Sequence, residues 1–195
     1  MRFGIILAAA LCAAFAAAQS GGIWSQVSTT YNRPQTPAAT LSDAQQKAVS
    51  QLLHSPGAFG DWDCPREEVN AAVKNARYEW IPVSDGQNVL LVESPAGCAR
   101  GGQGANGAMW LILFRGGIPT LIASPKLGFS GWLFAIQPTA SHGLCDIVLG
   151  WHMGARESGL NYFRFDGNTY QSVGSATLTF DENENGKIEP NPAAK

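Results

Sequence analysis

The amino-acid sequence predicts an α+β fold in which two short N-terminal helices are followed by a mostly antiparallel β-sheet meander. Residues 42–76 carry apolar side chains at helical spacing, whereas residues 78–180 consist of short apolar runs separated by turn residues at intervals of about 8 to 12 positions. No segment between these runs has the length and periodicity of a crossover helix, so the sequence disfavours a doubly wound parallel sheet.

Both helices have recognisable starting residues. Ser42 can cap the first helix, and Gln45 three residues later completes a capping box. The second helix is expected after Asp63, because Pro65 suits the first helical position and the carboxylates that follow suit the positive end of the helix dipole. The apolar residues expected on the buried faces are Ala44, Ala48 and Leu52 in the first helix and Val69, Ala72, Val73 and Ala76 in the second.

Short apolar runs bounded by glycine, aspartate or other turn residues are the predicted strands. They cover residues 78–83, 88–93, 109–114, 120–123, 132–136, 146–151, 160–165, 169–173 and 176–180. Trp110, Trp132 and Trp151 lie on these strands, and we expect them to fill the core.

Residues 1–18 have the features of a cleavable secretory signal peptide. Arg2 provides a positive start, an apolar stretch follows, and three alanines precede the expected cleavage site. We therefore expect an exported protein, periplasmic or extracellular, with no membrane span after cleavage. The rest of the chain is expected to form a flexible N-terminal arm (19–40), a single α+β globular domain (41–180) and a polar C-terminal tail (181–195).

The charged residues exclude two classes of partner. The chain has 13 Lys and Arg residues, including Arg2, against 15 Asp and Glu residues, and the basic residues are not clustered. Nucleic acids and anionic membrane surfaces attract basic patches, so neither is an expected partner. A protein or a cell-envelope glycan remains as the candidate partner.

Export would place Cys64, Cys98 and Cys145 in an oxidising compartment. Three cysteines permit one disulfide and leave one thiol. The sequence does not assign the pairing, but it slightly favours Cys64 with Cys98, because one precedes the second helix and the other lies in a glycine-rich loop. No spacing of cysteine and histidine residues suggests a zinc site.

The sequence contains no catalytic signature. Residues 102–107 fit G-x-G-x-x-G, but a predicted strand follows them, where a dinucleotide site requires a helix. Residues 128–131 match part of a nucleophile elbow, but Trp132 replaces its final glycine. His142 and His152 remain as candidate bases of an unrecognised secreted hydrolase. The prediction is a non-enzymatic protein without a cofactor, with that hydrolase as an alternative.

Residues 181–189 follow the first half of a calcium-binding loop. Oxygen ligands occupy its first, third and fifth positions and glycine the sixth, but Pro192 replaces the glutamate that normally closes the ligand shell. We therefore expect at most weak calcium binding, and a polar turn leading into the C-terminal tail explains the same residues. The candidate ligands are Asp181, Asn183, Asn185, Lys187 through its backbone carbonyl, and Glu189.

Residues 146–170, DIVLGWHMGARESGLNYFRFDGNTY, contain a D-I-V strand, a histidine, an E-S-x-L turn and the run F-R-F-D-G-x-x-Y. This segment resembles a family of small exported proteins of soil bacteria whose function is unknown. The resemblance implies an exported sheet domain and no particular activity. The chain departs from that pattern at Phe163, where the family has tyrosine, and at Cys98, where two cysteines are expected near the glycine-rich loop.

Within this segment, the run S-G-L-N-Y from Ser158 to Tyr162 resembles the S-G-x-K-Y loop of bacterial periplasmic inhibitors of C-type lysozyme. In those inhibitors the serine and lysine of the loop enter the lysozyme cleft. Asn161 replaces the lysine here, so the cation that would pair with the catalytic carboxylates is absent. A lysozyme-type glycosidase inhibitor is a second alternative, and a Ser-Gly turn between two strands explains the same residues.

The sequence thus predicts an exported, non-enzymatic globular protein with a binding or structural role. Surface loops carry contacts more often than core elements do, so we expect the contact sites at residues 156–162 and 98–107. The candidate binding residues are Arg156, Glu157, Ser158, Gly159 and Tyr162.

Overall fold

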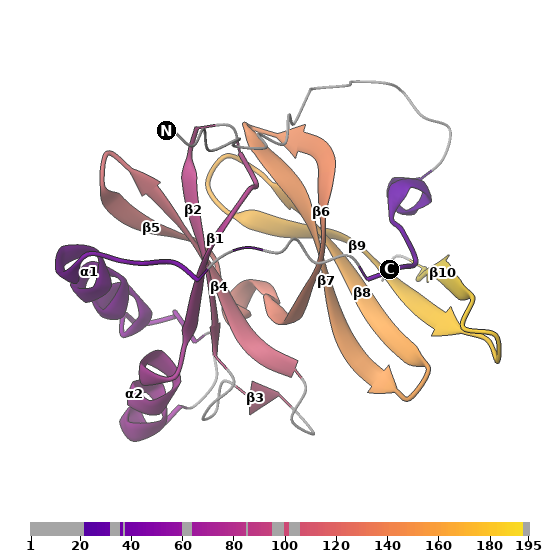
Figure 1. The fold of residues 1–195 in the computed structure, drawn as a ribbon, viewed down its shortest axis with the longest axis horizontal. Helices are drawn as coiled ribbons and strands as arrows, with labels where there is room; N and C mark the ends of the chain where they lie inside the picture. Colours follow the sequence, from indigo (N-terminus) through magenta and orange to yellow (C-terminus); the bar gives the residue numbers. More distant parts are fainter. Residues whose placement is uncertain are drawn as a thin grey trace, which may run out of the picture.

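An antiparallel sheet flanked by two helices forms the fold in the computed structural model (Figure 1). The structure describes residues 22–31, 36, 38–59, 64–84, 86–94, 100–101 and 106–192. The expected signal peptide, residues 1–18, lies outside the described residues. Among those described, no helix is long and apolar enough to cross a membrane.

The helical elements are η1 (Ile23–Gln26), α1 (Asp43–Leu53), α2 (Arg66–Lys74) and η3 (Pro125–Leu127). The strands are β1 (Arg77–Ile81), β2 (Asn88–Ser94), β3 (Arg100–Gly101), β4 (Asn106–Arg115), β5 (Ile118–Ala123), β6 (Ser130–Ser141), β7 (Leu144–Gly154), β8 (Glu157–Phe165), β9 (Tyr170–Phe180) and β10 (Gly186–Pro190). The α+β class and the mostly antiparallel sheet are therefore confirmed.

The sheet consists of two parts joined at a narrow connection. Its strand order is β1-β2-β4-β6-β7-β8-β9-β10, and β3 and β5 also pair with β4. The connection between β4 and β6 consists of the pairs Gly107 with Gly131 and Ala108 with Ser130. We call β1 to β5 the first half-sheet and β6 to β10 the second. Figure 1 shows α1 and α2 beside the first half-sheet and β10 at the far edge of the second.

A central core fills the space between the two half-sheets. Alternate residues of β4, such as Leu111 and Leu113, lie in one buried cluster with alternate residues of β7, such as Ile147 and Leu149. Phe129, which follows η3, packs in the same cluster. Since strands of both half-sheets contribute to this cluster, the narrow connection between β4 and β6 is reinforced by apolar packing.

The opposite face of the first half-sheet packs against the helices. Trp110 and Ile112 of β4 belong to one cluster with Val49 and Leu53 of α1. The fully buried Trp110 indole N–H donates to the Ala58 carbonyl oxygen at 2.5 Å. The start of α1 has the capping box that the sequence predicts, because the Ser42 hydroxyl accepts from the Gln45 backbone N–H and the Gln45 side chain accepts from the Ser42 backbone N–H.

The outer face of the second half-sheet is covered by residues 22–31, which we call the N-terminal segment. Val27 is buried, and Ile23 and Trp24 pack on a cluster that includes Tyr162. The Trp24 and Tyr162 rings meet edge to face with centroids 5.7 Å apart. These residues belong to the expected flexible arm (19–40), yet in the structure they close an apolar surface.

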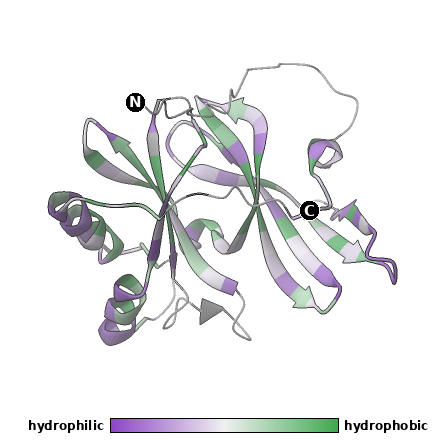
Figure 2. Ribbon diagram, in the orientation of Figure 1, coloured by the Kyte–Doolittle hydropathy of each residue, from purple (hydrophilic) through white to green (hydrophobic). Residues whose placement is uncertain are grey.

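The C-terminal end of the described chain also joins this half-sheet. Residues of the expected polar tail form β10, which pairs with β9 from Gly186 opposite Phe180 to Pro190 opposite Ala176. Ile188 packs against the outer cluster, whereas Lys187 and Glu189 are exposed. Figure 2 shows hydrophobic residues along the strands of both half-sheets and a hydrophilic turn between β9 and β10.

The cysteines are only partly described. Neither Cys64 nor Cys145 is a free thiol. Cys98, the expected partner of Cys64, lies outside the described residues. The Cys64–Cys98 pairing therefore stays a prediction.

Candidate functional site

A buried carboxylate lies on β7 in an otherwise apolar run. Asp146 is fully buried, and its neighbours along the strand, Cys145 and Ile147, point to the central core. The alternation of a strand therefore turns the Asp146 side chain toward the opposite face, the one covered by the N-terminal segment. Burying a charged group there requires a partner.

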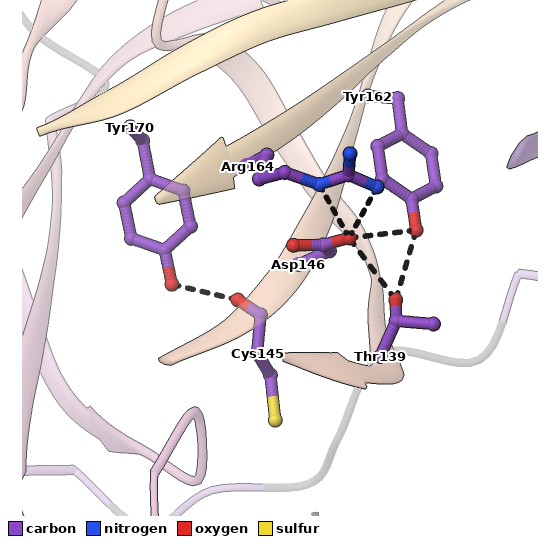
Figure 3. Close-up of polar contacts among 6 residues, drawn as sticks. All are labelled: Thr139, Cys145, Asp146, Tyr162, Arg164 and Tyr170. Carbon is purple, nitrogen blue, oxygen red and sulfur yellow. Dashed lines mark hydrogen bonds and ion pairs between the residues drawn. The ribbon is translucent and has the colours of Figure 1, made fainter. Parts of the chain in front are cut away.

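One oxygen of Asp146 receives every hydrogen bond that the side chain makes (Figure 3). Its Oδ2 accepts from the Thr139 hydroxyl at 3.1 Å and from the Tyr162 hydroxyl at 3.2 Å. The Arg164 guanidinium donates to the same oxygen through Nε at 3.3 Å and Nη2 at 3.2 Å. The other oxygen, Oδ1, is buried and has no hydrogen-bond partner. The cluster thus joins β6, β7 and β8, and it leaves Asp146 Oδ1 without a hydrogen-bond donor.

The two phenols beside this carboxylate remain protonated. Burial raises the pKa of Tyr162, and the Asp146 charge adds to the effect. Burial likewise raises the pKa of Tyr170, whose hydroxyl donates to the Cys145 carbonyl oxygen at 2.7 Å. Neutral phenols at physiological pH serve as fixed hydrogen-bond donors, so the arrangement resembles a structural network more than a proton-transfer site.

A second feature is a groove of about 460 Å³ where three segments meet, which we call the turn groove. The N-terminal segment, the β7–β8 turn and the β9–β10 turn each form part of its wall. Its lining residues are Thr29, Thr30, Tyr31, Ala155, Arg156, Phe180, Asp181, Glu182, Glu184 and Gly186.

Local hydrogen bonds fix the two turns that shape this groove. The Phe180 backbone N–H donates to the Arg156 carbonyl oxygen at 3.0 Å, which ties one turn to the other. The Asp181 carboxylate accepts from the backbone N–H groups of Asn183 and Asn185, both at 2.8 Å, and from the Asn185 side chain at 2.9 Å. This aspartate-centred turn leaves the side chains of Glu182 and Glu184 exposed.

The sequence-predicted binding residues separate into two groups. Arg156 lies in the β7–β8 turn and lines the turn groove, and Glu157 is exposed at the start of β8. The expectation of a surface loop from Arg156 to Tyr162 is wrong beyond the turn, because Ser158 to Tyr162 belong to β8 and Gly159 and Tyr162 are buried. Gly159 is covered by the Trp151 indole, so it cannot reach a partner.

The predicted calcium ligands are also divided. Asp181, Asn183 and Asn185 share one turn, but the Asp181 oxygens already accept hydrogen bonds within it. Lys187 and Glu189 lie along β10 and form an ion pair with each other at 2.6 Å. Among the described residues, no cluster of three histidine, cysteine, aspartate or glutamate side chains could hold a metal. Weak calcium binding stays a prediction.

The stability of the Asp181 turn should depend on pH. Its hydrogen bonds, first those from the Asn185 side chain and backbone and then that from the Asn183 backbone, hold the pKa of Asp181 below its ordinary value of 3.8. A lowered pKa means that the turn is stabilised above about pH 4 and loses this contribution as the pH falls through the folded-state pKa. We expect the Asn183 and Asn185 amide signals in NMR spectra to shift together below pH 4, and a midpoint above 4 would contradict this.

The candidate catalytic residues do not converge. His142 lies in the turn before β7, and His152 lies near the other end of that strand, with its ring tilted against Trp132 at a centroid distance of 4.4 Å. At a rise of about 3.3 Å per residue, the strand places His142 and His152 roughly 30 Å apart. Residues 102–105 of the glycine-rich motif lie outside the described residues, and Asn106 and Gly107 belong to β4.

Sequence reasoning missed the Asp146 cluster as a unit, although an aspartate inside an apolar strand run was a usable signal. It also missed that the Arg156 turn and the Asp181 turn are neighbours, because these meet only through strand pairing. Comparison with protein-family models, curated proteins and solved structures finds no match to this chain.

Proposed function

We propose that this chain is an exported, non-enzymatic binding domain that holds a polar segment of the cell-envelope glycan in the turn groove. The observation that carries the proposal is the set of exposed groups lining one groove, Arg156, Glu182 and Glu184 beside the half-exposed Tyr31 ring. Export is supported by the features of residues 1–18.

The charges of the groove are available to a ligand. No salt bridge engages Arg156, Glu182 or Glu184 in the part of the chain that the structure describes. A glycan offers hydroxyl groups that both accept from a guanidinium and donate to a carboxylate, so one ligand suits side chains of either sign. A volume of about 460 Å³ falls within the range of small-ligand sites, roughly 300 to 1,000 Å³.

The Tyr31 ring supplies the apolar part of the site. It is 50% exposed, and it contacts Phe134 with ring centroids 5.9 Å apart. This contact fixes the ring on the sheet while leaving part of it free to pack against the C–H face of a sugar. Tyrosine and arginine are also the residues most enriched at binding hot spots.

Neither alternative from the sequence has a structural observation that favours it. The inhibitor alternative depends on a protruding Ser158–Tyr162 loop, and this segment is a strand. The hydrolase alternative depends on His142 or His152, and neither lines the turn groove.

Co-sedimentation of the exported protein with purified peptidoglycan sacculi tests the proposal. We expect Tyr31→Ala and Arg156→Ala each to weaken binding about tenfold, which corresponds to about 1.4 kcal/mol. Arg115→Ala is the matched control, because Arg115 is an exposed arginine at the end of β4, outside the groove. Failure of the unchanged protein to sediment, or equal loss in the control, would refute the proposal.

A further inference from the structure

A groove of about 620 Å³ lies between α1 and α2, and we call it the interhelical groove. It is on the first half-sheet, away from the turn groove, whose β9–β10 turn is at the opposite end of the molecule in Figure 1. Residues spaced three or four apart along α1 form one wall, and residues of α2 form the other. The lining residues are Asp43, Gln46, Lys47, Ser50, His54, Asn70, Val73, Lys74 and Tyr78.

Hydrogen bonds hold the polar groups of this groove in place. The His54 ring bridges the helices, with Nδ1 at 2.7 Å from the Ser50 carbonyl oxygen and Nε2 at 2.9 Å from Asn70 Oδ1. The Tyr78 hydroxyl donates to the Val73 carbonyl oxygen at 3.3 Å. The contact between His54 and Asn70 thus links the two walls of the groove.

Two cations face this space from opposite walls. Lys47 lies on α1 and Lys74 on α2, both exposed, and neither forms a salt bridge with any described residue. Asp43 is the acidic residue among those lining the groove, and although it precedes Lys47 by four positions the two do not form an ion pair. The ammonium groups therefore have unused charge that an anion would neutralise.

We infer that the interhelical groove is a second binding site and that it takes a phosphate-bearing ligand with more than one negative charge. Lysine binds phosphate as a point charge and needs no fixed bidentate geometry, which suits two flexible side chains on separate helices. The α1 helix has 11 residues and is about 16 Å long, so its wall is long enough for a chain of linked phosphates. The Gln46 side chain adds an uncharged donor on the same wall.

The ligand chemistry has two sources, free oligophosphate and the phosphodiester chain of an envelope polymer. Isothermal titration of the exported protein at low salt with tripolyphosphate, and separately with poly(glycerol phosphate), distinguishes them. The compound that binds more tightly identifies which of the two sources supplies the ligand. With either, we expect the affinity to fall steeply as salt is added, because the attraction is between exposed charges.

Substitution of the two lysines tests the site itself. We expect Lys47→Gln combined with Lys74→Gln to weaken binding by at least about tenfold. Lys126→Gln, a change at an exposed lysine of η3 outside the groove, should leave it unchanged. Both variants should melt like the unchanged protein, since the substituted side chains have no partners to lose.

Absence of binding to both phosphate compounds at millimolar concentration would overturn the inference. So would an equal loss in the Lys126 variant, because general surface charge would then explain the binding. The glycan proposal is independent of this outcome, since Tyr31 and Arg156 do not line the interhelical groove.

Discussion

Replacing Gly131 with alanine should destabilise the fold by about 3 kcal/mol or more, the sum of a conformational and a steric cost. Gly131 has a φ of 108°, a backbone conformation that L-residues with a side chain rarely adopt. A Cβ atom there would also overlap the Gly150 carbonyl oxygen. That oxygen is backbone, so no rotamer change relieves the overlap. Gly131 further lies in the narrow connection between β4 and β6, where the two half-sheets meet.

Gly117→Ala separates the two costs. Gly117 has a φ of 84°, and a Cβ atom there would have no atom within 4 Å. This variant carries the conformational cost alone, about 1 kcal/mol. Urea unfolding of both variants measures the difference, and equal destabilisation would mean that the connection between the half-sheets relaxes freely.

The alternation of short apolar runs predicts the sheet correctly, but not its division into halves. Gly131, in the connection between the half-sheets, has a positive φ, which the residue type permits without requiring. Register shifts in β6 between Leu133 and Ala135 and between Ile136 and Ala140 interrupt its alternation. The sequence pattern therefore ends the strand at residue 136, whereas β6 continues to Ser141.

The two ends of the domain show a different limit of sequence reasoning. Residues 22–31 contain serines, threonines and glycine, a composition typical of a mobile arm. Ile23, Trp24 and Val27 nevertheless lie at the outer face of the second half-sheet, which is apolar and lies away from α1 and α2 (Figure 1). Such a segment is ordered by the apolar surface on which it packs. Other parts of the chain form that surface, so the composition of the segment alone does not predict the packing.

The candidate site was predicted in part for a related reason. Arg156 was expected at a surface turn and lies at one. The rest of that expected loop is strand because the β7–β8 turn is short, and Gly159 pairs with Trp151 directly across from it. Sequence patterns locate turns well, but they set turn length poorly.

Arg164→Met should destabilise the protein by about 3 kcal/mol or more, because it removes the cation from a fully buried carboxylate. Asp146 would keep its hydrogen bonds from Thr139 and Tyr162, yet its charge would be unpaired. The reverse change, Asp146→Asn, should cost less, about 1 kcal/mol, because the Arg164 side chain is 44% exposed and water can solvate it.

Combining Asp146→Asn with Arg164→Met provides the decisive comparison. If the unpaired buried charge causes the loss, the double variant should be more stable than Arg164→Met alone, because no charge is left in the site. If lost packing of the arginine side chain causes it, the double variant should be no more stable than the single one. Chemical denaturation of the three variants distinguishes these cases, and the second result would show that the cluster acts through packing and not through charge.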